Sequence, residues 1–337
     1  MSASYIVRLV GLSFAAFFLV HVALSFLVLA IAPRVLRAAD GMRAHAAERL
    51  LMALRLGPAA VAACTVVTLC IPSYLWFEPR GIAEEDVGLV CVVAAILGLG
   101  GWALSTTRAA RAWLASARYT RACRRAGSIE LLPGLRPLLA GDQAVAAPAV
   151  VVDQRGALVA LCGIVRPALL VSRRVLASLD AEQLDATLRH EYAHRSARHN
   201  LKRLLFLVTP DALPFHRSFA AIEARWTRFA EWAADDEVAT GNPARALALA
   251  SALVRVAQLG REPELPLACS LTSGGRDLEA RVTRLLEVTP YPEAAAHVAA
   301  ERSFALAAAL TAVALSALLL VPVLLPPVHR LLEQLIR

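Results

Sequence analysis

Four stretches of the chain contain no Asp, Glu, Lys or Arg, and they limit its possible folds more than any other feature. They cover residues 9–33, 57–77, 87–107 and 303–328. Each has at least the roughly 20 residues that a helix needs to cross about 30 Å of hydrocarbon. The chain is also 58% hydrophobic, more than the roughly half that is usual in soluble domains. We therefore predict four transmembrane helices, with Pro72 tolerated inside the second because neighbouring helices can satisfy the freed carbonyl.

Charged residues flank these stretches and predict how the chain is oriented. Arginines gather between the first and second stretches and again after the third: Arg34, Arg37, Arg43, Arg49, Arg55, Arg108, Arg111, Arg118, Arg121, Arg124 and Arg125. The link at residues 78–86 is acidic and has Arg80 as its single basic residue. Because basic residues stay on the cytoplasmic side, we expect the basic link and the segment after the third helix in the cytoplasm and both termini outside. This is the topology of a multi-pass protein of the cell's inner (cytoplasmic) membrane.

The net charge of +8 raises the question of a nucleic-acid partner. A nucleic-acid-binding domain concentrates its basic residues in one patch or stripe, whereas here they border the apolar stretches. We therefore expect the lipid bilayer and a protein substrate as partners, and no direct contact with nucleic acid.

The apolar stretches divide the chain into three parts. Residues 1–107 are expected to hold three transmembrane helices joined by the basic cytoplasmic link, and residues 303–337 the fourth helix and a short tail. Residues 108–302 are long enough for one globular domain with its own core. The expected fold class is a mainly α membrane protein with one α+β domain, and any chemistry should lie in that domain.

Short apolar runs in the middle segment predict strands. The runs are separated by turn-forming residues and cover residues 149–152, 157–161 and 168–171. Their spacing predicts a small three-stranded meander. Before it we expect a basic helix at residues 108–126 and, because Pro and Gly are frequent there, a loop at residues 127–148.

Longer helices are predicted after the strands. Asp180 with Gln183 three residues later is a start signal of the capping-box kind. We expect that helix to run to about Val208, since Pro210 cannot continue it. Further helices are expected at about residues 219–239, 243–258 and 276–287.

The first of these helices carries His190-Glu191-Tyr192-Ala193-His194. A separation of four residues puts both imidazoles on one helix face, where their nitrogens can converge on one zinc ion. Glu191 lies beside them, where a carboxylate can reach water at the metal without being a ligand. The pattern predicts a zinc site of the HExxH type, with His190 and His194 as ligands and Glu191 as the catalytic base.

A third ligand has to come from another element. Glu231 and Asp235 are four residues apart on the following helix. They could form a solvated acidic face with the acidic residues after them, at a repulsion of a few tenths of a kcal/mol. Alternatively, Glu231 is the third ligand and Asp235 accepts the N–H of a ligand imidazole. The residues alone leave both interpretations open.

Three blocks of the chain together resemble the membrane metallopeptidases related to the BlaR/MecR antirepressors and, more distantly, the HtpX/Ste24 proteases. In chain order they are residues 162–171, which include Gly163-Ile164-Val165-Arg166-Pro167, then residues 184–194 and residues 231–235. The resemblance implies a zincin-like catalytic domain placed after three membrane helices and before a fourth. By position it also implies these roles: zinc ligands His190, His194 and Glu231, catalytic acid Glu191, and supporting residue Asp235.

His199 and residues 281–286 are two further places that bear on the resemblance. Members often carry an acid where this chain has His199. His199 lies off the ligand face of the predicted helix, so we interpret it as structural. Residues 281–286 resemble a late family segment, and we interpret them as a helix with core-facing leucines and solvated arginines, among them Arg281.

These features predict an integral-membrane zinc metalloendopeptidase. Zinc supplies Lewis acidity, while Glu191 takes a proton from water and passes it to the leaving amine. The strand that contains Ala157, Val159 and Leu161 is expected to pair with an extended substrate, as exposed sheet edges do.

The resemblance favours one role among three. It implies regulatory proteolysis of a cytoplasmic transcriptional repressor in signal transduction. A quality-control protease of the HtpX/Ste24 type is the alternative among enzymes. A non-enzymatic membrane receptor or scaffold with a retained zinc fold is the third, and the presence of Glu191 argues against it because a structural site needs no general base.

Overall fold

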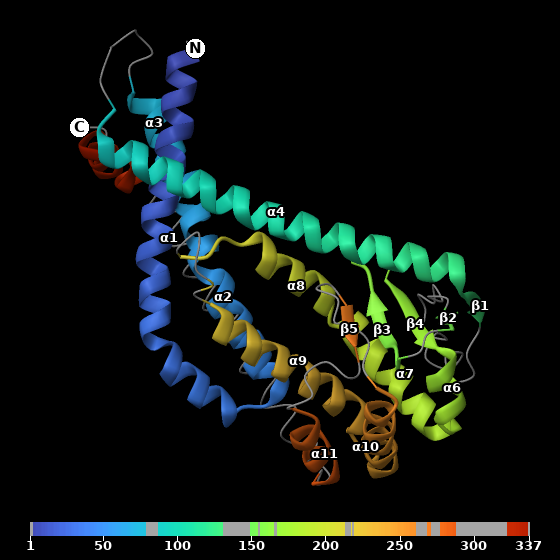
Figure 1. Cartoon of the computed structure of the whole chain (residues 1–337). Coiled ribbons are helices and arrows are strands. Elements are labelled where there is room, and N and C mark those ends of the chain that lie inside the picture. The colour runs from blue at the N-terminus through green and yellow to red at the C-terminus, as the bar shows by residue number, and fades with distance from the viewer. Residues whose placement is uncertain are drawn as a thin grey trace.

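Three long helical segments dominate the computed structural model (Figure 1). They are α1 (Ala3–Asp40), α4 (Leu89–Ala126), and a composite of α2 (Ala44–Thr65), the π-helical η1 (Val66–Cys70) and α3 (Ile71–Phe77). The structure describes residues 3–78, 87–130, 149–153, 156–164, 167–212, 217, 219–260, 268–270, 277–287 and 322–335.

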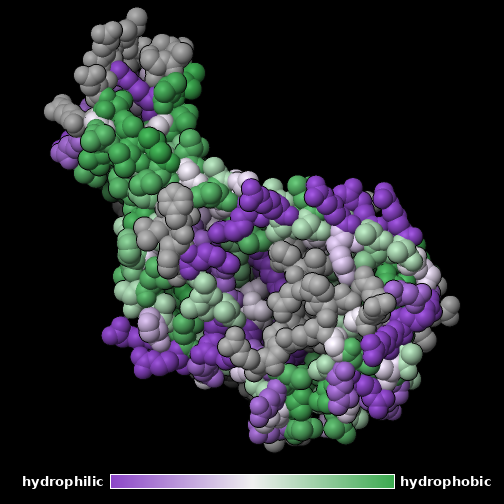
Figure 2. Space-filling view, viewed as in Figure 1, coloured by the Kyte–Doolittle hydropathy of each residue, from purple (hydrophilic) through white to green (hydrophobic). Residues whose placement is uncertain are grey.

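These three segments are long and apolar enough to cross a membrane, as predicted for the first three stretches. Figure 2 shows hydrophobic side chains gathered at the upper left of the molecule, where α3 and the amino-terminal parts of α1 and α4 lie. The exposed ones include Ile6, Val7, Val10, Trp76, Leu89, Val90, Val93 and Ile96. An apolar surface of this extent is unusual on a monomer in water. The fourth predicted span at residues 303–328 lies mostly outside the described residues, although residues 322–335 are helical.

The composite helix changes its hydrogen bonding around Pro72. This proline lies in the first turn of α3, and the π-helical η1 comes directly before it. Proline has no N–H, so a carbonyl one turn earlier loses its usual partner, and a local π turn is one way in which membrane helices adjust. The second apolar stretch is therefore helical throughout, as predicted, with one irregular turn.

The predicted basic link between the first two membrane helices is itself almost entirely helical. Only residues 41–43 separate the end of α1 from the start of α2. The amino-terminal half of α2 then packs against α9 (Ala220–Ala239) in a shared hydrophobic core. Arg55, one of the predicted flanking charges, is fully buried there and donates to Glu223 at 2.8 Å. The link is thus part of a core that it shares with α9 rather than a separate loop.

The small sheet differs from the predicted meander. Its order is β1-β2-β4-β3-β5, with β2 (Ala149–Val152), β3 (Val159–Cys162) and β4 (Ala168–Ser172) near the predicted positions. However, β4 lies between the other two, parallel to β2 and antiparallel to β3. The prediction failed because apolar runs indicate strands without indicating their neighbours. The segment at 127–148, predicted as a loop, also begins with a strand, β1 (Ser128–Glu130), and its residues 131–148 lie outside the described residues.

Both faces of the sheet are covered, which explains why β2, β3 and β4 are apolar throughout. The carboxyl-terminal part of α4 packs on one face, where Cys123 belongs to one buried cluster with Val150, Val152 and Leu170. Alternate residues of the same strands pack on the other face against α7 (Ala181–Ser196) and α10 (Pro243–Gln258). Strands buried on two faces have continuous apolar runs instead of alternation.

The predicted helix from Asp180 to Val208 is two helices. Asp180 caps α7 as predicted, since its side chain accepts from Gln183 N at 2.8 Å and the Gln183 side chain bonds back to Asp180 N. The chain then breaks at Arg198, whose φ of 53° is left-handed, and α8 (His199–Val208) begins. The predicted end at Val208 is confirmed, but the break left no Gly or Pro signal in the sequence.

The remaining helices agree with the predictions. After α9, Asn242 caps α10 by accepting from Arg245 N, and Pro243 occupies the first turn. The helix predicted at about residues 276–287 is α11 (Leu278–Leu286). Together α7, α9, α10 and α11 form the layer beneath the sheet that carries the candidate site (Figure 1).

Candidate metal centre

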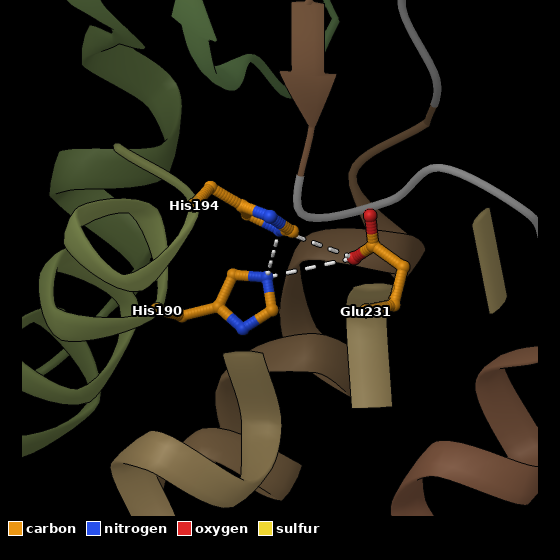
Figure 3. Close-up of side chains that lie close together, drawn as sticks. All are labelled: His190, His194 and Glu231. Atoms are coloured by element: carbon orange, nitrogen blue, oxygen red, sulfur yellow. Dashed lines mark hydrogen bonds and ion pairs between the residues drawn. The ribbon is translucent and has the colours of Figure 1, made fainter. Parts of the chain in front are cut away.

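His190 and His194 extend from one face of α7 toward α9 (Figure 3). Their Nε2 atoms lie 3.0 Å apart, and neither residue is exposed by more than 1%. The capped start of α7 and its packing against α9 and α10 fix the direction of both rings. The predicted pair of imidazoles is therefore brought together, with both Nε2 atoms facing the same point.

Glu231 approaches this point from α9. Its Oε2 lies 3.5 Å from Nε2 of His190 and 3.6 Å from Nε2 of His194. All three potential ligand atoms lie within 4.8 Å of one another and their residues are buried. Glu231 is therefore not part of a solvated acidic face, because it is buried and faces the two histidines. Two imidazoles and one carboxylate form a donor set typical of catalytic zinc.

Glu191 supplies an independent test of whether a metal fits. Its side chain is 1% exposed, and no side chain among the described residues hydrogen-bonds to its carboxylate, although the backbone of Leu161 lies close enough to lower its pKa. A buried unpartnered carboxylate is unfavourable unless the site is completed by a further group. Burial raises the pKa of Glu191 to about 8. The residues thus fit a bound zinc ion with its water, and the structure places Glu191 beside the ligands as the motif predicted.

Asp235 lies behind His190, on the side away from the other ligands. Its Oδ1 is 3.0 Å from Nδ1 of His190. This contact favours a proton on Nδ1 and leaves Nε2 of that ring free to bind a metal. Asp235 also accepts two bonds from Arg281, at 2.8 and 2.7 Å.

Arg281 was wrongly interpreted as a solvated residue of the last helix. It is 2% exposed, and its Nη1 also lies 3.2 Å from Oε2 of Glu231. Arg281 lies on the same helix face as Leu278 and Leu285, three and four residues away, so its position in that stripe was a usable signal. Buried arginines are rare, which is why the solvated interpretation seemed safer. The interpretation as a solvated arginine fits Arg284 better, since the side chain of Arg284 is partly exposed.

His199 is a second residue whose place the sequence did not reveal. It is 1% exposed, and its Nδ1 contacts Nδ1 of His194. The break at Arg198 turns the first residue of α8 back toward α7, whereas a continuous helix would have directed His199 away from the ligand face.

Charges in the site shift several pKa values in opposite directions. Burial alone would lower the pKa of His190, but contacts with Asp235 and Glu231 raise it to about 9. Burial lowers the pKa of His194 to about 3. Burial would raise the pKa of Glu231, but the neighbouring histidines and Arg281 hold it well below its usual range. The candidate ligands are therefore one ionised carboxylate, Glu231, and two imidazoles of which His190 is the more basic.

The strand predicted to bind substrate does not have a free edge. Val159 and Leu161 belong to β3, which pairs with β4 on one side and with β5 (Ala268–Ser270) on the other. Ala157 N donates to Gly260 O at 3.0 Å. The prediction of an exposed edge is wrong because residues 268–270, which carry no strong strand signal, occupy it.

A surface pocket of about 400 Å³ opens beside His194. Its walls include Leu161 from β3, Ile164 and Pro167 from the β3–β4 turn, and Asn200 from α8. The Asn200 amide donates to Leu161 O at 2.8 Å and to Gly163 O at 2.9 Å, so it holds this turn against α8. The pocket connects a ligand histidine with the surface.

Comparison with known proteins agrees with this geometry. Residues 139–265 match the model of peptidase family M48. The matched segment contains α7 and α9, and with them all three candidate metal ligands. A search of curated proteins found no significant match. The family match and the three apolar helices indicate a membrane metalloprotease.

Proposed function

We propose that the protein is a zinc metalloendopeptidase that hydrolyses peptide bonds at the membrane. The observation that carries this proposal is the convergence of Nε2 of His190, Nε2 of His194 and a carboxylate oxygen of Glu231, with the unpartnered Glu191 beside them. These three residues are the proposed zinc ligands, and M48 peptidases are the matched family.

Glu191 and Asp235 each have a defined part in the proposed reaction. Zinc, when bound, supplies Lewis acidity toward water and the peptide carbonyl. Glu191 takes a proton from water and later gives it to the leaving amine. Its pKa of about 8 lies near neutral pH, where a group can both accept and release a proton. Asp235 holds the proton on Nδ1 of His190 and so keeps Nε2 available.

The zinc peptidase is tested on the full chain purified in detergent. Wild type is expected to contain one zinc per chain and to cleave casein. Glu191→Gln should retain the zinc but lose at least about 100-fold in rate, the size expected for a general base. His190→Ala should lose both zinc and activity. The proposal fails if purified wild type does not bind zinc, or if Glu191→Gln cleaves as fast as wild type.

We also propose that the catalytic domain faces the cytoplasm, with the protein in the inner membrane. The support is the charge pattern, because Arg34, Arg37, Arg43 and Arg49 flank the α1–α2 turn while residues 78–86 are acidic. Basic residues favour the cytoplasmic side.

For the substrate, we propose a cytoplasmic transcriptional repressor that is cut in response to a signal. The support is the resemblance of residues 162–171, 184–194 and 231–235 to the BlaR/MecR antirepressors, together with the proposed orientation. Glu191→Gln should capture this repressor in cells, detected by crosslinking and mass spectrometry. His190→Ala is the control. A repressor that is enriched over the control and cut by wild type supports the role, while enrichment of misfolded membrane proteins alone contradicts it.

A further inference from the structure

Among the described residues, no carboxylate lies beside the outer nitrogen, Nδ1, of His194. His194 directs Nε2 toward His190 and Glu231, so as a neutral metal ligand it carries its proton on Nδ1. That Nδ1 contacts Nδ1 of His199. His190, by contrast, has its Nδ1 directly beside Asp235. The two ligand histidines are thus supported differently.

The contact fixes which nitrogen of His199 bears a proton. Nδ1 of His199 must accept from His194, so the neutral His199 ring carries its proton on Nε2. Nε2 of His199 lies 3.2 Å from Oε1 of Glu48. Each step therefore has one donor and one acceptor, from His194 through His199 to a carboxylate.

Glu48 belongs to α2, the helix that continues into the second apolar stretch. It is 2% exposed although it lies within a turn of the helix start, and its second partner is Lys202 Nζ at 2.6 Å. The ring of Trp226, on α9, packs edge to face against the ring of His199, with the two ring centroids 5.8 Å apart. The packing of α2 against α9 thus brings Glu48 to the metal centre from outside the matched family segment.

We propose that Glu48 is a positioning residue for the zinc ligand His194 and acts on it through His199. The membrane hairpin α1–α2 thereby contributes to zinc affinity, because a displacement of α2 relative to α8 would separate Glu48 from His199. This proposal rests on the proposed zinc site. It adds a residue that lies 142 positions before His190 in the chain.

Zinc affinity is the measurement that tests this role, by chelator competition on the full chain in detergent. Glu48→Gln should weaken zinc binding about 10- to 100-fold, the size found for residues that orient metal ligands. Lys202→Met is the matched control. It removes the other partner of Glu48 but leaves His199 in place, and its zinc affinity should equal that of wild type.

His199→Asp provides a bypass. An aspartate oxygen takes nearly the place of the ring's Nδ1, since both atoms are bonded to the γ carbon. The carboxylate can then accept directly from His194, so adding Glu48→Gln to His199→Asp should cause no further loss of zinc affinity. Thermal unfolding of the metal-free proteins checks that each variant folds, and Glu48→Asp replaces Glu48→Gln if the latter does not.

The outcomes separate the two proposals. If wild type binds no zinc, the proposed function is wrong. If wild type binds zinc and Glu48→Gln binds it equally well, only the proposed role of Glu48 is wrong. That role is also wrong if Lys202→Met loses as much zinc affinity as Glu48→Gln, because the ion pair between Lys202 and Glu48 would then explain the effect. It is wrong as well if Glu48→Gln still weakens zinc binding in the His199→Asp protein.

Discussion

The most unusual single residue of the site is Arg281, a fully buried cation between two buried carboxylates. It bonds Asp235 through two nitrogens and lies near Glu231. Removing one partner of a buried ion pair leaves the other charge uncompensated, which is far more damaging than losing an exposed pair.

Arg281→Met should therefore lower the unfolding free energy of the metal-free protein by about 3–5 kcal/mol. Arg284→Met on the same helix is the control, since Arg284 pairs with Asp236 at a partly exposed position and should lose at most about 1 kcal/mol. Thermal unfolding in detergent measures both. Equal effects of the two substitutions would contradict the importance of the buried pairs.

Acid should expose the role of Asp235. Burial would raise the pKa of its carboxyl, but the charge of Arg281 and the contact with His190 lower it below 3.8. A lowered folded pKa means that Asp235 stabilises the fold fully above about pH 4, and that this contribution disappears as the pH falls through the lower folded value. Asp235→Asn should lose stability at pH 7, and its difference from wild type should shrink as the pH falls below about 4. Unfolding midpoints of EDTA-treated protein across this range would show parallel curves if Asp235 contributed nothing.

Much of the candidate site was readable from the chain, and the parts that were not have a common cause. His190, Glu191 and His194 are neighbours on one helix, so their spacing alone defines a site. Glu231 needed a family resemblance in addition, because it comes from a second helix. Arg281 shares a helix face with Leu278 and Leu285, which indicated burial but not its partners. Those partners, like the contact between His199 and Glu48, depend on how distant helices pack.

At the scale of elements, close contact between α1 and α4 depends on a small residue. A Cβ added at Gly98 would lie 2.5 Å from Phe14 O, whereas nothing lies within 4 Å of one added at Gly100. Small residues let membrane helices approach each other closely. Gly98→Val should therefore cost about 1–3 kcal/mol through overpacking, and Gly100→Val much less. Unfolding in detergent compares them, and similar losses would argue against this packing.

Element prediction succeeded where the signal was local. The Asp180 cap and the first three apolar stretches each specify a helix or its end within a few residues. The sheet order was not predictable, because β4 reaches its place between β2 and β3 through long-range pairing. The β5 strand at residues 268–270 was missed because three residues are too few to form a periodic pattern.

At the scale of the whole molecule, the proposed orientation rests on the distribution of charge. Reporter fusions should place residue 82, in the acidic link, outside the cell and residue 140 inside. The arginines around the α1–α2 turn are the cause, so replacing Arg34, Arg37, Arg43 and Arg49 together should weaken this preference. The reverse pattern in the unaltered chain would remove the cytoplasmic substrate proposal while leaving the zinc site unaffected.

The shared core of α2 and α9 has a consequence for how the protein is made. Leu51 of α2 packs in one cluster with Trp226 and Phe229 of α9. During translation the α1–α2 hairpin leaves the ribosome long before Glu231 is synthesised. The α1–α2 hairpin is therefore available for packing before α9 emerges. A chain in which α2 did not reach this place would leave the apolar residues of α9 uncovered, so the fold of the candidate site depends on α2.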